Sequence, residues 1–198
     1  MKKIILPLFI FLSTFSLFSR DFDYRDIPVQ DSGRIKPLDT FARNQLLSLY
    51  GKRSLKSENI SAIDWLINLL ADPHEGFNQK VFKLRNPEVV QSLGLEWDNV
   101  HIYSYHEILG GLENQKELLI QIHGKPEDEL SIIESQLKEL HANFQKFANM
   151  WWHLKIIPPA SDNPEDPWIS PWEVESEQAL TKHQRNLLFN FLEYLNKR

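Results

Sequence analysis

The chain has 198 residues, of which 42% are hydrophobic and 25% are charged, so it has the composition of a globular protein with enough apolar material for a core of its own. It has no cysteine, which excludes disulfides, thiol nucleophiles, iron–sulfur clusters and cysteine zinc sites. Its 27 acidic residues outnumber its 22 basic ones, and the resulting net charge of −5 argues against nucleic acid as a partner.

Residues 1–19 have the pattern of a secretory signal peptide. Lys2 and Lys3 precede an apolar run from Ile4 to Phe18, and Ser19 is a small residue at the expected cleavage site. The run is shorter than the ~20 residues that cross a bilayer comfortably. We therefore expect a protein that is exported to a bacterial periplasm. The alternative is an uncleaved signal that keeps the protein associated with the membrane.

Residues 20–156 predict a mainly helical domain with a small β element, a hairpin, near the mature N-terminus. Ile27–Val29 and Arg34–Lys36 have strand character, and the turn signal Asp31-Ser32-Gly33 lies between them. A helix should follow Pro37. Its signals are a cap at Asp39 or Thr40, an apolar face of Phe41, Leu46, Leu47 and Tyr50, and a terminator at Gly51.

The middle of the chain predicts several shorter elements from their start and stop signals. In chain order they are a helix from Ser61 to Asp72-Pro73, a strand at Lys80–Leu84 that is expected to pair with the hairpin, a short helix from Asn86-Pro87, a strand at Val100–Tyr103, and a helix from Ser104 that is interrupted at Gly110-Gly111 and resumes to His123.

The C-terminal half predicts long antiparallel helices. A helix starting at Gly124-Lys-Pro126 has apolar residues at alternating steps of three and four, the spacing of a helix-hairpin or coiled-coil seam: Leu130, Ile133, Leu137, Leu140, Phe144, Phe147 and Trp151. Residues 157–173, rich in proline and tryptophan, predict an extended linker or a lid. Residues 174–198 predict a last helix that packs on the domain through Leu180, Leu187, Leu188, Phe191 and Leu195.

No catalytic or metal-binding motif is present. The chain lacks a P-loop, a dinucleotide-binding glycine motif, a nucleophile elbow and the paired histidines of zinc proteases. Its seven histidines have no metal-binding spacing, so we expect them to be scattered and predict neither a metal site nor a cofactor. Haem needs only one or two axial ligands, and His153, at a helix end, is the candidate for that role.

The tryptophans allow two interpretations. Trp152 follows the seam residue Trp151 and must point elsewhere, while Trp168 and Trp172 lie beside prolines. Such residues pack an extended segment onto the protein body, or they form an aromatic docking surface for a partner, a flat ligand or the membrane interface.

One stretch has a specific resemblance. Ile27-Pro-Val-Gln-Asp-Ser-Gly-Arg-Ile-Lys-Pro-Leu-Asp-Thr-Phe-Ala-Arg43 resembles a segment of Ccs-type (system II) cytochrome c biogenesis proteins, which lies in an extracytoplasmic region attached to the haem-handling membrane subunit. Lys80–Lys83 with Asn86–Val89, and Tyr103–Leu109, look similar to later parts of that region. The tryptophan-rich haem motif and the many membrane spans of that subunit are missing here. The resemblance therefore implies an accessory periplasmic domain that assists haem delivery or apocytochrome presentation, and it supplies no catalytic residues.

Within that stretch, Gln30, Arg34, Lys36 and Arg43 are not required by the turn or the helix start. Together with Asp31 they predict a contact site for a carboxylate, either a haem propionate or an acidic side chain of a partner. The predicted function is a binding module of cytochrome c maturation, not an enzyme, whose partners are a membrane-embedded assembly subunit and, with it, apocytochrome c or haem. The alternatives are a haem or small-molecule carrier, a helical protein-interaction scaffold, and a hydrolytic or lytic enzyme.

Overall fold

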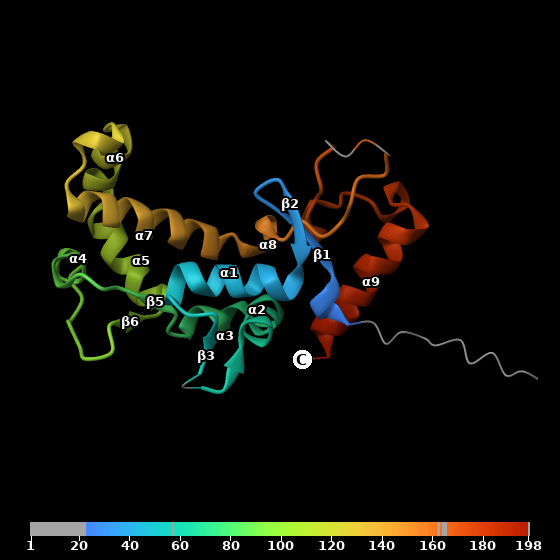
Figure 1. Cartoon of the computed structure of the whole chain (residues 1–198), viewed down its shortest axis with the longest axis horizontal. Coiled ribbons are helices and arrows are strands. Elements are labelled where there is room, and N and C mark those ends of the chain that lie inside the picture. Colours follow the sequence, from blue (N-terminus) through green and yellow to red (C-terminus); the bar gives the residue numbers. More distant parts are fainter. Residues whose placement is uncertain (1–22, 57, 162, 164–165, 198) are drawn as a thin grey trace, which may run out of the picture.

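The computed structural model describes residues 23–197 except 57, 162 and 164–165, so the predicted signal peptide lies outside the described residues (Figure 1). Within that part of the chain, no helix combines the length and the apolar character needed to cross a bilayer. The fold is mainly helical, with small antiparallel sheets of two strands each, one of them near the start, and this confirms the predicted fold class.

Most elements follow one another with short connections, and the longest stretch between two of them runs from α8 to η3. The N-terminal half contains η1 (Tyr24–Asp26), β1 (Pro28–Asp31), β2 (Arg34–Pro37), α1 (Leu38–Tyr50), β3 (Ser54–Leu55), β4 (Ile60–Ser61), α2 (Ala62–Ala71), α3 (Pro73–Asn78), β5 (Phe82–Lys83) and α4 (Pro87–Ser92). The C-terminal half contains β6 (Ile102–Tyr103), α5 (Tyr105–Asn114), α6 (Lys116–Gly124), η2 (Glu127–Glu129), α7 (Ile132–Ala148), α8 (Met150–His153), η3 (Pro171–Glu173), η4 (Glu177–Ala179) and α9 (Lys182–Asn196).

The arrangement is elongated, with α6 at one end and α9 at the other (Figure 1). Helix α1 packs against α2 in the middle, while α4, α5 and α6 all contact α7. A single apolar core joins these helices, and the ring of Trp65 on α2 stacks near that of Phe147 on α7, with their centroids 6.3 Å apart. The hairpin β1–β2 protrudes beside the end of α7, nearer to α9 than to α6 (Figure 1).

The predicted hairpin is confirmed. Ser32 and Gly33 have φ angles of 55° and 74°, the left-handed pair that a two-residue hairpin turn requires, and Asp31 pairs with Arg34 across it. The predicted cap of the next helix is wrong: α1 begins at Leu38, one residue before Asp39, because the N–H of Leu38 donates to the carbonyl of Ile27 in the strand. Asp39 instead accepts a hydrogen bond from Arg43 on the same helix.

Other boundaries in the first half are partly as predicted. Gly51 ends α1 in the left-handed conformation. Leu47 is 40% exposed, so it does not belong to the buried face. Asp72 does more than end a helix, because its side chain caps α3, which the sequence reasoning missed. Strand β5 pairs with β6 and not with the hairpin, which corrects that expectation.

The glycine pair does not break its helix. The predicted capping box of Ser104 and Glu107 opens α5, which continues through Gly110 and Gly111 to Asn114, and the break comes at Gln115. Gly111 is buried against Leu93, where a side chain would meet the backbone. The second glycine is thus a packing feature of a continuous helix.

The seam of apolar residues lies inside the protein. Helix α7 starts later than predicted because residues 127–129 form a 3₁₀ turn and Ser131 supplies a capping box with Glu134. The seam residues that α7 buries are Leu137, Leu140, Phe144 and Phe147. Since this face is already covered, it is not available to pair with another protein, which argues against the scaffold alternative in that form.

The segment after α8 folds back onto the body. Ile157 and Ile169 form an antiparallel bridge, and Trp168 is only 9% exposed. Helix α9 begins at Lys182, later than expected, because η4 and the Thr181 capping box precede it. It packs against α2, and Tyr194 stacks on Tyr24 of η1 with ring centroids 3.9 Å apart.

Candidate functional site

The structure brings the hairpin next to the segment that follows α7, although more than a hundred residues separate them in sequence. The backbone N–H of Gln30 donates to the carbonyl of Lys155 at 2.9 Å. The side-chain oxygen of Gln30 accepts a hydrogen bond from the backbone of Trp168 at 3.3 Å. Two regions that the sequence reasoning selected separately therefore form one surface, and Gln30 acts as a structural link between them.

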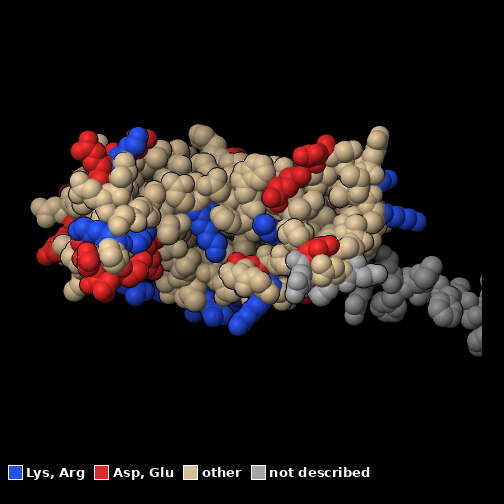
Figure 2. All heavy atoms as spheres, turned by 90° about the horizontal axis from the view of Figure 1, so that it is seen from above, with Lys and Arg blue, Asp and Glu red and all other residues tan. Residues whose placement is uncertain are grey.

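Charged side chains gather where these segments meet. Lys36 donates to Asp31 at 2.9 Å, and both side chains are mostly buried. The charge of Lys146, at the end of α7, also interacts with Asp31. His153 interacts electrostatically with Asp31, Lys146 and Lys155. We call these five residues, Asp31, Lys36, Lys146, His153 and Lys155, the Asp31 cluster. Figure 2 shows Lys and Arg side chains near the middle of the face seen from above, with Asp and Glu side chains next to them.

The cluster is electropositive. Burial alone would raise the pKa of Asp31, but the hydrogen bond from Lys36 and the charge of Lys146 outweigh it and hold that pKa below its usual value. Burial, together with the charges of Lys146 and Lys155, lowers the pKa of His153, and Asp31 opposes that shift. With His153 neutral, the cluster contains three lysines and one carboxylate, so it has a net positive charge on an otherwise acidic protein.

Two exposed tryptophans lie on α8, which carries His153 of the cluster, and on η3, which packs on α8. Trp152 is next to His153 in α8 and is 52% exposed, while Trp172 in η3 is 39% exposed. The ring of Trp172 lies 6.4 Å from that of Trp151, centroid to centroid, so η3 packs on α8 and brings the two exposed tryptophans to neighbouring elements. Trp168 is buried and has the packing role.

The remaining predicted site residues divide into two groups. Arg43 pairs with Asp39 at 2.7 Å on α1, and Lys36 is occupied by Asp31, so neither is a free cation. The side chain of Arg34, at the hairpin turn, is exposed and has no hydrogen-bond or ion-pair partner among the described residues, whereas its backbone pairs with Asp31. Sequence reasoning missed Lys146 and Lys155. In the sequence they are ordinary polar positions, and only the folded chain brings Lys146 near Asp31 and joins the backbone of Lys155 to Gln30.

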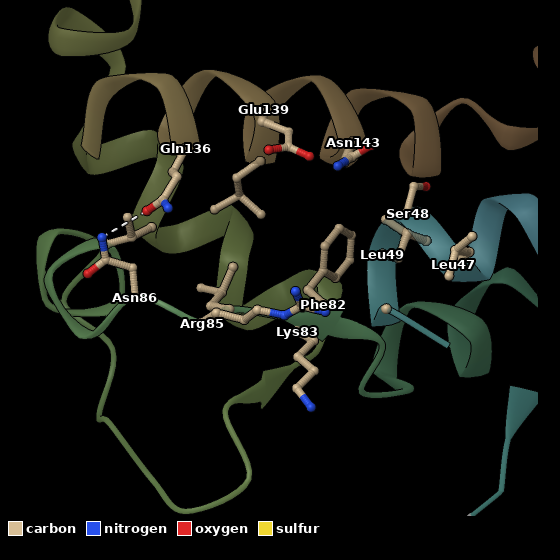
Figure 3. A pocket seen from close by; sticks show the side chains of 14 residues that line it. Leu47, Ser48, Leu49, Phe82, Lys83, Arg85, Asn86, Gln136, Glu139 and Asn143 are labelled. Atoms are coloured by element: carbon tan, nitrogen blue, oxygen red, sulfur yellow. Dashed lines mark hydrogen bonds between the residues drawn. The ribbon is translucent and has the colours of Figure 1, made fainter. Parts of the chain in front are cut away.

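A separate groove of about 380 Å³ lies between the end of α1, residues 82–89 and α7 (Figure 3). Arg85 and Glu139 extend into it, and Asn86 donates to Gln136 across one end at 2.8 Å (Figure 3). Arg85 also covers Gly51, where the last carbonyls of α1 favour a cation. Glu139 is the one carboxylate among the described residues lining the groove, so the pair of carboxylates that a glycosidase needs is not found there.

Within the described residues, no three side chains of histidine, aspartate or glutamate lie close enough together to share a metal ion. The expectation that the histidines are scattered is nevertheless wrong for one pair, because His123 of α6 and His141 of α7 approach to 2.9 Å. Their separation of 18 positions gives no sequence signal of this contact.

Comparison with known proteins gives no match, either to a family model or to a curated protein. The resemblance of Ile27–Arg43 to the Ccs type therefore stays a prediction that depends on the residues of that segment.

Proposed function

We propose that this protein is a binding module without catalysis, which docks through the Asp31 cluster and its two exposed tryptophans onto an acidic surface of a membrane-bound partner. The observation that carries this proposal is the convergence of Lys146 and Lys155 on His153 of α8, the helix that also carries the exposed Trp152. Binding hot spots are enriched in tryptophan, and a basic patch speeds the encounter with an acidic partner.

The resemblance of the hairpin segment supplies the biological setting. We propose that the module works in the periplasm in cytochrome c maturation, beside the membrane subunit that handles haem. The same segment that resembles the Ccs type provides Asp31 and Lys36 to the cluster. The partner face would then be an acidic extracytoplasmic surface of that subunit or of apocytochrome c.

Site-specific photo-crosslinking tests the docking surface. A photoreactive residue at Trp152 should crosslink to a membrane protein in the native membrane, while the same probe at Ile132 should not. Ile132 is the matched control because it is 75% exposed on the first turn of α7, toward the α6 end. Replacement of Lys146 and Lys155 by glutamine should abolish the Trp152 crosslink without lowering the melting temperature. Equal crosslinks from both positions would contradict docking through this surface.

A deletion strain tests the biological setting separately. Covalently bound haem in the membrane cytochromes should fall when the gene is deleted, and the glutamine variant should fail to restore it. An unchanged cytochrome content would refute the role in maturation even if the crosslink is found.

A second candidate function, haem carriage, is favoured by His153, which follows the exposed Trp152 in α8 and is near the charges of Lys146 and Lys155, two cations that suit propionates. Titration of haem into the purified protein should then give a Soret band that is lost in His153→Ala. A band that persists in this variant would exclude His153 as the ligand.

A further inference from the structure

The hairpin of α6 and α7, at the end of the molecule away from the Asp31 cluster, is held in a fixed geometry (Figure 1). Lys125 donates to Glu134 at 2.6 Å and Lys138 donates to Glu127 at 2.7 Å, so two ion pairs link the connection between the helices to α7. Leu119 and Ile122 of α6 are buried in the core. Side chains that face each other across the two helices are therefore prepositioned.

Two histidines meet across this hairpin. The Nε2 atom of His123 lies 2.9 Å from the Nδ1 atom of His141, and the ring centroids are 5.1 Å apart. The other ring nitrogen of His141 lies 3.2 Å from the side-chain amide of Gln145, one turn further along α7. His123 is exposed and His141 is half-buried, so an ion in solvent can reach both rings.

The separation of the two nitrogens matches adjacent ligand positions on a metal ion. Imidazole nitrogens bind transition metals at ~2.1 Å, and two of them at right angles on one ion are then ~3 Å apart. We propose that His123 and His141 form a two-histidine site for a late divalent transition metal, with Cu²⁺ bound most tightly and water in the remaining positions. Imidazole suits copper, nickel and zinc, and Cu²⁺ has the highest affinity in that series.

Metal binding requires the proton between the two rings to move to another nitrogen. Without metal, one N–H joins the rings, and His141 accepts from Gln145 through its Nε2. When Nε2 of His123 and Nδ1 of His141 bind the ion, the proton moves to Nε2 of His141. Gln145 accepts it through its oxygen once its amide turns over, so no net proton is released. Gln145 is thus a positioning residue, since a ligating histidine commonly donates its second N–H to such a partner.

The two lysines of the hairpin do not oppose the metal strongly, because each has a carboxylate partner. The site is independent of the Asp31 cluster, and its loss would leave the proposed docking function untouched.

Titration of the purified full chain with Cu²⁺ alone tests the proposal. One Cu²⁺ should bind per chain, with an electron paramagnetic resonance spectrum showing two nitrogen ligands. At a free Cu²⁺ concentration a hundred times the dissociation constant, the melting temperature should rise by about 5–10 °C. His123→Ala and His141→Ala should each remove one nitrogen from the spectrum and most of the thermal shift. Gln145→Ala should weaken binding by about tenfold while keeping both nitrogens.

His183→Ala is the matched control, because this exposed histidine lies on α9 at the other end of the molecule. It should bind Cu²⁺ as the wild type does. Binding unchanged in both His123→Ala and His141→Ala, or a spectrum with a single nitrogen ligand in the wild type, would overturn the proposal.

Discussion

Gly110 and Gly111 are neighbours in the middle of α5, and replacement of each by alanine should change the free energy of unfolding by clearly different amounts. Gly110 is exposed, and an added Cβ atom would meet nothing within 4 Å. Gly111 is buried, and its Cβ would lie 2.6 Å from the Cβ and 2.7 Å from the carbonyl oxygen of Leu93. The obstacle is the backbone of Leu93, which cannot rotate away.

The magnitudes follow from two terms. Alanine is favoured over glycine inside a helix by about 0.8–1.0 kcal/mol, and both variants gain this amount. Gly111→Ala also overpacks the contact with Leu93, which costs about 1–3 kcal/mol. The propensity term cancels in the comparison, so Gly111→Ala should be less stable than Gly110→Ala by about 1–3 kcal/mol.

Urea denaturation followed by far-ultraviolet circular dichroism measures this difference directly. In a separate thermal unfolding experiment, Gly110→Ala should raise the melting temperature by about 2–4 °C relative to the wild type. Similar slopes with urea in the two variants would show that the folded and unfolded states keep their compactness. The reasoning is refuted if Gly111→Ala is as stable as Gly110→Ala, because α5 would then not be pressed against Leu93.

Three further predictions concern the core and two ion pairs. Phe147→Ala should lower the free energy of unfolding by about 3–5 kcal/mol, measured by urea denaturation, because the ring is fully buried; a loss below about 1 kcal/mol would contradict this. Lys36 holds the pKa of Asp31 below its usual value, so ionised Asp31 stabilises the folded state. The wild type should therefore melt at a higher temperature than Asp31→Asn above pH 3.8, and this difference should shrink as the pH falls further. Thermal unfolding of both proteins at several pH values measures it. The hydrogen bond from Lys125 lowers the pKa of Glu134 to about 2, so the ion pair of these two residues should persist down to low pH. The protection of α6 amides from hydrogen exchange should therefore be constant above pH 4.5 and decline between pH 4.5 and 2. Glu134→Gln should abolish this pH dependence.

The sequence alone predicted the features whose partners lie within a few positions. The turn at Ser32-Gly33 and the caps at Ser61 and Ser104 are set by side chains that bond to backbone close by, so short windows of sequence suffice. The alternating spacing of Leu137 to Phe147 predicted a buried face for the same reason.

The tertiary structure decided everything that joins distant segments. The sequence predicted a helix break at the glycine pair because the residues next to Gly111 give no sign that it packs on Leu93. Likewise, β5 pairs with β6 and not with the hairpin, since strand pairing depends on which segments the packing of the core brings together.

The same division applies to the sites. The sequence offered Asp31, Lys36 and the tryptophans as candidates, whereas Lys146 and Lys155 come near Asp31 and His153 only in the folded chain. His123 and His141 are in contact because α6 packs back on α7, and their spacing along the chain does not predict that contact. Local capping and periodicity act within about one helical turn, whereas a binding site needs charges and rings from several elements, whose meeting is determined by how the apolar faces pack.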